Sequence, residues 1–324
     1  MEERIIADFE LIRQDDLYLV ERKGRYFKVG LLEGELLSKR LEGYSDEEIA
    51  CKMKMTKEDV ERFFEEAEKA GIIGAEKKEK KNILFYKIPL IEADRFMKML
   101  SDCLRRIDSR VLKFMFAFTT LIMMAGIADT IVNYKSITEI EVISLPAYQY
   151  AVLYAMFVLT IVIHETSHGV TCRYFGGKVG KIGFILLLFQ PAFYCDISGV
   201  RRIKSRKKQV LTSFAGIYSN LFLMSISMFA FQMTGHKILG LFVLGNASIV
   251  LYNIIPLVKL DGYWMLSFAT DITNLYDKSR KGVRMIIDGK NFKERFIGVY
   301  GIVTYGFIIM AIGSLFYSFI TALV

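Results

Sequence analysis

The chain has 324 residues, of which 53% are hydrophobic and 24% charged, with a mean hydropathy of +0.32 and a formal net charge of +8. This apolarity excludes an ordinary soluble enzyme and predicts a membrane protein, while the charged fraction requires a soluble part as well. Residues 1–74 carry 13 basic and 19 acidic side chains, net −6, which leaves +14 for the rest of the chain. The basic excess therefore belongs to the apolar part.

The start of the chain is acidic and has no basic stretch followed by an apolar run, so we expect no signal peptide and a cytosolic N-terminus. The four cysteines have no paired spacing and predict reduced thiols rather than a disulfide framework. They lie at positions 51, 103, 172 and 195.

The sequence pattern of residues 1–74 predicts a small α+β domain. Two short alternating runs, 17–21 and 26–29, flank a glycine-containing turn and indicate a hairpin. Ser45 and Glu48 have the spacing of a capping box at the start of a helix. Three helices are expected after the hairpin, over about 32–42, from residue 45, and from residue 56 to a stop at 71.

A charged segment, 75–110, joins this domain to the apolar part. It contains an extended stretch that ends at Pro89 and an amphipathic helix near 92–107, which we expect on the membrane surface. The remaining residues, 111–324, hold five apolar runs near the ~20 residues that a bilayer core requires. These five predicted spans cover roughly 112–132, 148–172, 209–233, 238–257 and 297–322.

Basic residues concentrate in alternate connections between the spans, which places the N-terminus in the cytosol and the C-terminus outside. The run 182–195 is apolar but too short to cross, and basic clusters of the same side flank it, so we expect it to enter the membrane and return. The predicted fold is an α-helical polytopic membrane protein of the plasma membrane. It has about five transmembrane helices, a re-entrant hairpin and a small N-terminal winged-helix-like α+β domain.

Two of the three histidines, His164 and His168, stand four residues apart with Glu165 between them. Positions i and i+4 share one face of a helix, so both imidazoles reach one Zn²⁺ while Glu165 lies beside a water on the metal. This is the His-Glu-x-x-His pattern of zinc metallopeptidases. An ionisable cluster inside a membrane span costs several kcal/mol unless it is partnered, which favours a functional site over a chance occurrence of the motif.

A catalytic zinc needs a third protein ligand, and the candidate is Asp261 near the cytosolic end of the fourth span. His164 lies nine residues before Arg173, roughly 13 Å below the cytosolic surface at about 1.5 Å per helical residue. Both ligand sets therefore fall in the same leaflet. The alternative for Asp261 is an interfacial ion pair with Lys259.

The motif at 164–168, His-Glu-Thr-Ser-His, and the segment 253–262, Asn-x-x-Pro leading to Leu-Asp-Gly, resemble the site-2 protease family of intramembrane metallopeptidases over about 110–324. The resemblance implies that the two histidines and Asp261 bind one Zn²⁺ per chain and that Glu165 is the catalytic base. Such a metal lowers the pKa of a water molecule to about 7, and Glu165 accepts its proton as the peptide carbonyl is attacked. The chain departs from the family at Tyr263, where many members have a second glycine, and it has no PDZ-like insert.

Three further polar residues are candidates for a role in the site. Asn220 and Asn253 are amides within the spans that either support the oxyanion or join helices. The segment 190–196 is expected to offer an unpaired edge to which an extended substrate adds as a strand. Asp196 in that segment either supports the site or is a simple interfacial residue.

The apolar spacing over about 15–74 resembles a PqqD-like peptide-recognition domain, a module that binds leader peptides of ribosomally made, modified peptides. A helix-turn-helix that binds DNA is the alternative, but a net charge of −6 repels phosphate, so we expect no nucleic acid partner. The residues that carry the resemblance are Leu36, Leu37, Gly43, Ile49, Ala50, Val60, Gly71, Ile72 and Ile73.

Together, the two parts predict an intramembrane zinc endopeptidase that cleaves a modified precursor peptide, captured by its leader, during maturation. A peptide exporter or a modifying enzyme is an expected partner besides the lipid bilayer. Two alternatives stay open. One is a site-2 protease that cleaves a transmembrane signalling protein, and the other is a non-catalytic peptide-binding or immunity protein that retains a structural metal.

Overall fold

The computed structural model describes residues 9–323 with the exception of 15, 23–24, 75–84, 141–144, 188–189, 281 and 288–290. The chain forms two compact units. The first combines Met1–Met99 with Cys172–Lys204, and the second combines Leu100–Thr171 with Ser205–Val324. Chain segments far apart in sequence thus build each unit.

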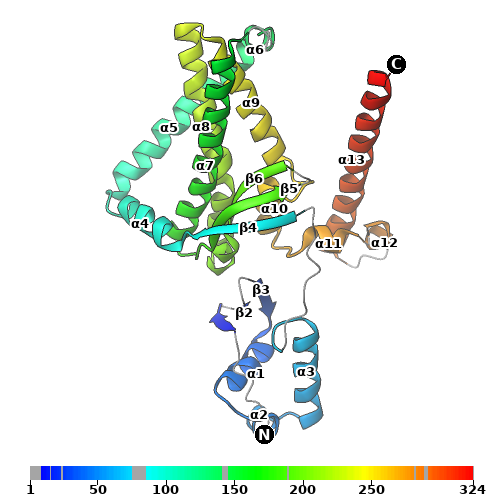
Figure 1. Ribbon diagram of the computed structural model, residues 1–324. Coiled ribbons are helices and arrows are strands. Elements are labelled where there is room, and N and C mark those ends of the chain that lie inside the picture. The colour runs from blue at the N-terminus through cyan, green and yellow to red at the C-terminus, as the bar shows by residue number, and fades with distance from the viewer. Residues whose placement is uncertain are drawn as a thin grey trace. The chain divides into compact units, whose positions relative to one another are not determined.

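The N-terminal part of the first unit begins with a three-stranded antiparallel sheet in the order β1-β2-β3; Figure 1 labels β2 and β3. The predicted hairpin is confirmed as β2 (Tyr18–Arg22) and β3 (Arg25–Val29). The strand β1 (Glu10–Arg13) was not expected, because its two apolar residues are adjacent and show no alternation.

Three helices follow this sheet, as predicted: α1 (Leu31–Leu41), α2 (Asp46–Met53) and α3 (Lys57–Lys69). Ser45 and Glu48 form a reciprocal capping box at the start of α2. Gly71, with φ +81°, ends α3 in the left-handed conformation that glycine adopts without strain. The helices bury one face of the sheet in a core that contains Val20, Leu36, Leu37, Ile49, Val60 and Phe64.

The second sheet of this unit has the order β4-β5-β6, with β4 (Phe85–Glu92), β5 (Lys181–Leu187) and β6 (Gln190–Cys195). The predicted re-entrant run forms the β5–β6 hairpin, and β6 lies at an edge of the sheet. The expectation that the preceding extended stretch ends at Pro89 was wrong. β4 continues to Glu92 because a register shift between Pro89 and Ile91 accommodates the proline on an edge strand.

Four helices in the described part of the chain are long and apolar enough to cross a membrane, which indicates a membrane protein. They are α5 (Ser109–Val132), α7 (Ala147–Tyr174), α8 (Arg206–Thr234) and α9 (Lys237–Ile254), close to the first four predicted spans (Figure 1). A long helix, α13 (Phe292–Leu323), forms where the fifth span is predicted, but it is not among these four. The number of crossings and the orientation of the termini therefore stay predictions.

Shorter helices connect these long ones. The amphipathic helix predicted near 92–107 is present as α4 (Asp94–Arg105), while its position on a membrane surface stays a prediction. The others are the 3₁₀ helix Ser198–Arg202, α6 (Tyr134–Thr138), α10 (Asp261–Thr270), α11 (Leu275–Ser279) and α12 (Gly282–Ile287).

Small residues let the long helices of the second unit approach closely. A Cβ on Gly126 of α5 would lie 2.3 Å from the Cβ of Ser225 on α8, and a Cβ on Gly245 of α9 would lie 2.1 Å from the ring of Phe157 on α7. Small residues at helix contacts are typical of packing within a bilayer, where close backbone approach replaces the hydrophobic effect. This packing fixes α7, which carries His164 and His168, against α8.

Candidate metal centre

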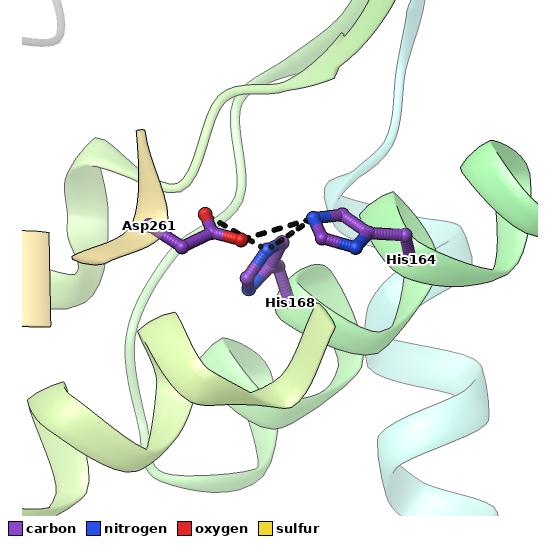
Figure 2. A group of neighbouring side chains, drawn as sticks. All are labelled: His164, His168 and Asp261. Carbon is purple, nitrogen blue, oxygen red and sulfur yellow. Dashed lines mark hydrogen bonds and ion pairs between the residues drawn. The ribbon is translucent and has the colours of Figure 1, made fainter. Parts of the chain in front are cut away.

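Two buried histidines and one half-buried aspartate of the second unit converge with their donor atoms facing one another (Figure 2). His164 and His168 come from α7, and Asp261 is the first residue of α10. The two Nε2 atoms are 3.1 Å apart, while the Asp261 carboxylate lies 3.1 Å from His164 Nε2 and 3.2 Å from His168 Nε2. The structure thus brings together the three residues that the sequence predicts as metal ligands.

The spacing of the histidines along α7 explains how they meet. Residues four apart share a helix face, and the two rings lie 4.7 Å apart in an edge-to-face arrangement. His164 and His168 are only 8% and 3% exposed, so neither imidazole has open access to water. Two polar side chains that are buried in this way need hydrogen-bond partners or a bound metal ion.

Each imidazole is held by its other ring nitrogen. Nδ1 of His168 donates to the backbone carbonyl of Thr212 at 2.8 Å, and Nδ1 of His164 lies 3.3 Å from the Asn220 side-chain oxygen. Because a carbonyl oxygen only accepts, the proton resides on Nδ1 and Nε2 keeps its lone pair. Both lone pairs then point into the cluster.

The donor set fits a zinc ion. Zinc ligands at about 2.0–2.1 Å in tetrahedral geometry lie roughly 3.3 Å from one another, close to the spacing seen here. Asp261 Oδ2 is buried and lacks a hydrogen-bond partner, although it approaches His164 Nε2. Without a cation, two lone pairs and a carboxylate would face one another at short range, which is unfavourable.

A glycine keeps space beside the two imidazoles. A Cβ on Gly216 of α8 would lie 2.4 Å from His168 Nε2 and 2.5 Å from His164 Nε2. Any side chain at this position would therefore push into the donor atoms. Gly216 was not predicted as part of the site, because a helical glycine by itself carries no signal of its neighbours in space.

The position of Asp261 differs in detail from the prediction. It was expected near the end of the fourth span, but α9 ends at Ile254, and the turn 255–260 leads into a new helix that begins at Asp261. Proline at 256 stops the helix because its ring cannot continue the hydrogen-bond ladder. The carboxylate therefore comes from the N-terminal end of a short helix.

Two contacts hold this turn. The Tyr300 hydroxyl donates to the carbonyl of Pro256 at 2.8 Å. Gly262 passes close to the preceding helix end, since a Cβ there would lie 2.3 Å from the carbonyl oxygen of Ile254. Lys259 is 3.6 Å from Asp277, so the alternative of an ion pair between Lys259 and Asp261 is not what the structure shows.

The remaining predicted residues lie in different surroundings. Glu165 follows His164 on α7 and is half-buried. Asn220 reaches the cluster through His164, whereas the Asn253 amide donates to the Ile249 carbonyl one turn earlier in its own helix. Asp196, in the other unit, accepts a hydrogen bond from the backbone of Ser198, a local contact in a turn.

The chain is similar to a bacterial protein described as "Putative peptide zinc metalloprotease protein YydH" from Bacillus subtilis (strain 168). The two are 30% identical over 115 residues, which is 34% of this chain and 44% of that protein. The matched region thus spans less than half of the relative. No family model matches the sequence, and no solved structure matches it.

Proposed function

We propose that this chain is a zinc-dependent endopeptidase that works within the membrane, with His164, His168 and Asp261 as zinc ligands and Glu165 as the general base. The observation that carries this proposal is the close approach of the two Nε2 atoms, 3.1 Å apart, to a carboxylate whose two oxygens lie 3.1 Å from His164 and 3.2 Å from His168. The similarity to a protein described as a peptide zinc metalloprotease supports it independently.

The residues around the triangle have separate tasks in peptide hydrolysis. When bound, zinc supplies a Lewis acid that polarises the attacking water and the scissile carbonyl. Glu165 accepts a proton from the water while the oxygen of that water attacks the carbonyl carbon. Glu165 then donates this proton to the amine nitrogen as the carbon–nitrogen bond breaks. Asn220 and the Thr212 carbonyl keep the imidazoles in the tautomer that binds metal.

The substrate that fits best is a ribosomally made and modified precursor peptide. The N-terminal domain of net charge −6 would capture a basic leader, in line with its resemblance to peptide-recognition modules. The β6 edge offers backbone hydrogen bonds to an extended peptide. Capture by one part of the chain raises the concentration of the peptide near the site of cleavage.

Replacing Glu165 by Gln tests the catalytic proposal. The Glu165→Gln protein should bind zinc as the wild type does and lose cleavage of a precursor peptide by at least about a hundredfold, because the base is gone. Thr166→Ala, a change at the next position of the same helix, is the control and should retain activity. Cleavage at the wild-type rate by Glu165→Gln would leave only a peptide-binding role.

Removing residues 1–74 tests the choice of substrate. Cleavage of the precursor peptide should fall in the truncated chain, while a single-span transmembrane protein would be cut equally with or without this domain. Unchanged cleavage of the precursor would reject the maturation role and favour proteolysis of a transmembrane signalling protein.

A further inference from the structure

The sheet of the N-terminal domain has a second face that the helical core does not cover. Val20 on β2 packs into the core, so its neighbour Glu21 points to the opposite face. The strand register places Glu10 of β1, Glu21 of β2 and Tyr26 of β3 directly across from one another. This row, Glu10–Glu21–Tyr26, lies on the outer face of the sheet.

An arginine from a distant part of the chain sits on this row. Arg202 ends the 3₁₀ helix Ser198–Arg202, and its Nε donates to Glu21 at 2.7 Å while Nη2 lies 2.5 Å from the same carboxylate. Nη2 also pairs with Glu10, and Lys178 Nζ lies 3.3 Å from Glu10. Both Arg202 nitrogens converge on one oxygen, Oε2, of Glu21, a two-nitrogen contact that a lysine, with its single nitrogen, cannot make.

The contact is packed as well as charged. The Arg202 side chain is only 14% exposed, and its neighbours Val200 and Ile203 are buried. Leu19 lies next to Val20 on β2 and therefore points away from the helical core, yet it is 1% exposed. Since β3 contacts the 3₁₀ helix directly, the outer face meets the segment 198–203 at β2 and β3, while Glu10 on β1 stays exposed.

The two acids need this arginine. Like charges directly opposite on neighbouring strands destabilise a sheet, and Glu10 and Glu21 are such a pair. Burial raises the pKa of Glu10, but hydrogen bonds from Arg202 and Lys178 outweigh it and hold the pKa below its usual value. The Glu10 carboxylate is therefore charged at neutral pH, and the two cations that contact it, Arg202 and Lys178, come from a part of the chain outside residues 1–74.

We propose that the segment 198–203 is a docking site for the outer face of the N-terminal sheet, with Arg202 as the clamp. The domain is then held on the chain segment that leads into α8, instead of being attached through its linker alone. Arg202 precedes the start of α8 by four residues and Thr212, which holds His168, by ten. A peptide that binds the sheet would act on the segment that leads into this helix.

Hydrogen exchange of the full-length protein in detergent tests the docking without reference to proteolysis. Arg202→Gln should speed amide exchange in residues 25–29 and 198–203 by about tenfold or more, while α2 and α3 keep their protection. Lys207→Gln, an exposed change in the first turn of α8, is the matched control and should leave exchange in all these segments unchanged.

A charge swap makes the test specific. Arg202→Glu alone should release the domain, and Arg202→Glu combined with Glu21→Arg should restore protection of 198–203. Wild-type exchange in both Arg202 variants would overturn the proposal. If Arg202→Glu also speeds amide exchange in α2 and α3, the milder variant Glu10→Gln replaces it as the test. Faster exchange in 198–203 with α3 still protected supports docking, and unchanged exchange in 198–203 rejects it.

Discussion

At the scale of single residues, the neighbours of the proposed ligands determine the geometry of the site as much as the ligands do. The Nδ1 atoms of His164 and His168 are engaged by Asn220 and by the carbonyl of Thr212, so the lone pairs of Nε2 are directed inwards. Gly216 leaves the space beside them free of side-chain atoms. An unfilled triangle of donors is unfavourable in a buried place, and a cation removes that cost.

Gly216→Ala should weaken zinc binding. The new Cβ would overlap the space of both Nε2 atoms, so the imidazoles must move and the triangle is distorted. We expect a loss of affinity in the range of about 10–100-fold that changes next to metal ligands produce. Zinc retained after dialysis against a graded series of chelator concentrations measures it.

Gly306→Ala in α13 is the matched control, because a Cβ there meets nothing within 4 Å. It should bind zinc like the wild type. Equal affinity in the Gly216→Ala and Gly306→Ala variants would show that the metal, if bound, lies elsewhere.

At the scale of elements, the third ligand depends on a turn rather than on a span. Pro256 separates α9 from α10, and Tyr300 of α13 holds the carbonyl of Pro256. The sequence predicted Asp261 as the ligand but not this turn, since a tyrosine 44 residues away gives no local signal. Where the determinants are local, as in the capping box of Ser45 and Glu48, the prediction was confirmed.

Tyr300→Phe should loosen the turn that carries Asp261. The variant leaves the half-buried Pro256 carbonyl without this partner, at the cost of one ordinary hydrogen bond, about 0.5–1.5 kcal/mol. We expect weaker zinc binding and a lower kcat, with KM changed little because the tyrosine holds a ligand and not the substrate. Steady-state kinetics at saturating and at limiting zinc separate the two effects.

Tyr305→Phe is the control for Tyr300→Phe, as Tyr305 lies on the same helix and is exposed. A fall in kcat that saturating zinc does not reverse, with unaltered zinc affinity, would contradict a role in positioning the ligand.

At the scale of the whole molecule, segregation of apolar and charged residues was enough to predict a membrane protein with a separate acidic part. Four helices that are long and apolar enough to cross a membrane support the prediction of a membrane protein. The division into units was not predictable, because β4 joins the hairpin of residues 181–195 through pairing across almost a hundred residues. Such long-range pairing leaves no mark in local periodicity.

Removal of zinc should lower the stability of the folded protein. A ligand that binds only the folded state raises the free energy of unfolding by RT ln(1 + [L]/Kd). This is about 4 kcal/mol when zinc is present at a thousand times its Kd. Adding a chelator should therefore lower the Tm of the wild type measured in detergent.

The Asp261→Asn variant provides the internal reference for this experiment, because it lacks the anionic ligand. Before chelator is added, the Tm of this variant should be lower than that of the wild type, and the chelator should change it little. An equal chelator-induced shift in both proteins would mean that the stabilising metal does not use Asp261.

Zinc X-ray absorption spectroscopy of the purified chain tests most directly whether two imidazoles and one carboxylate hold a zinc ion. We predict one zinc per chain with two nitrogen ligands and oxygen ligands at about 2.0–2.1 Å. The imidazole signal should be reduced by half or lost in His168→Ala. A zinc-free protein after purification with added zinc, or a spectrum that His168→Ala leaves unchanged, would contradict it.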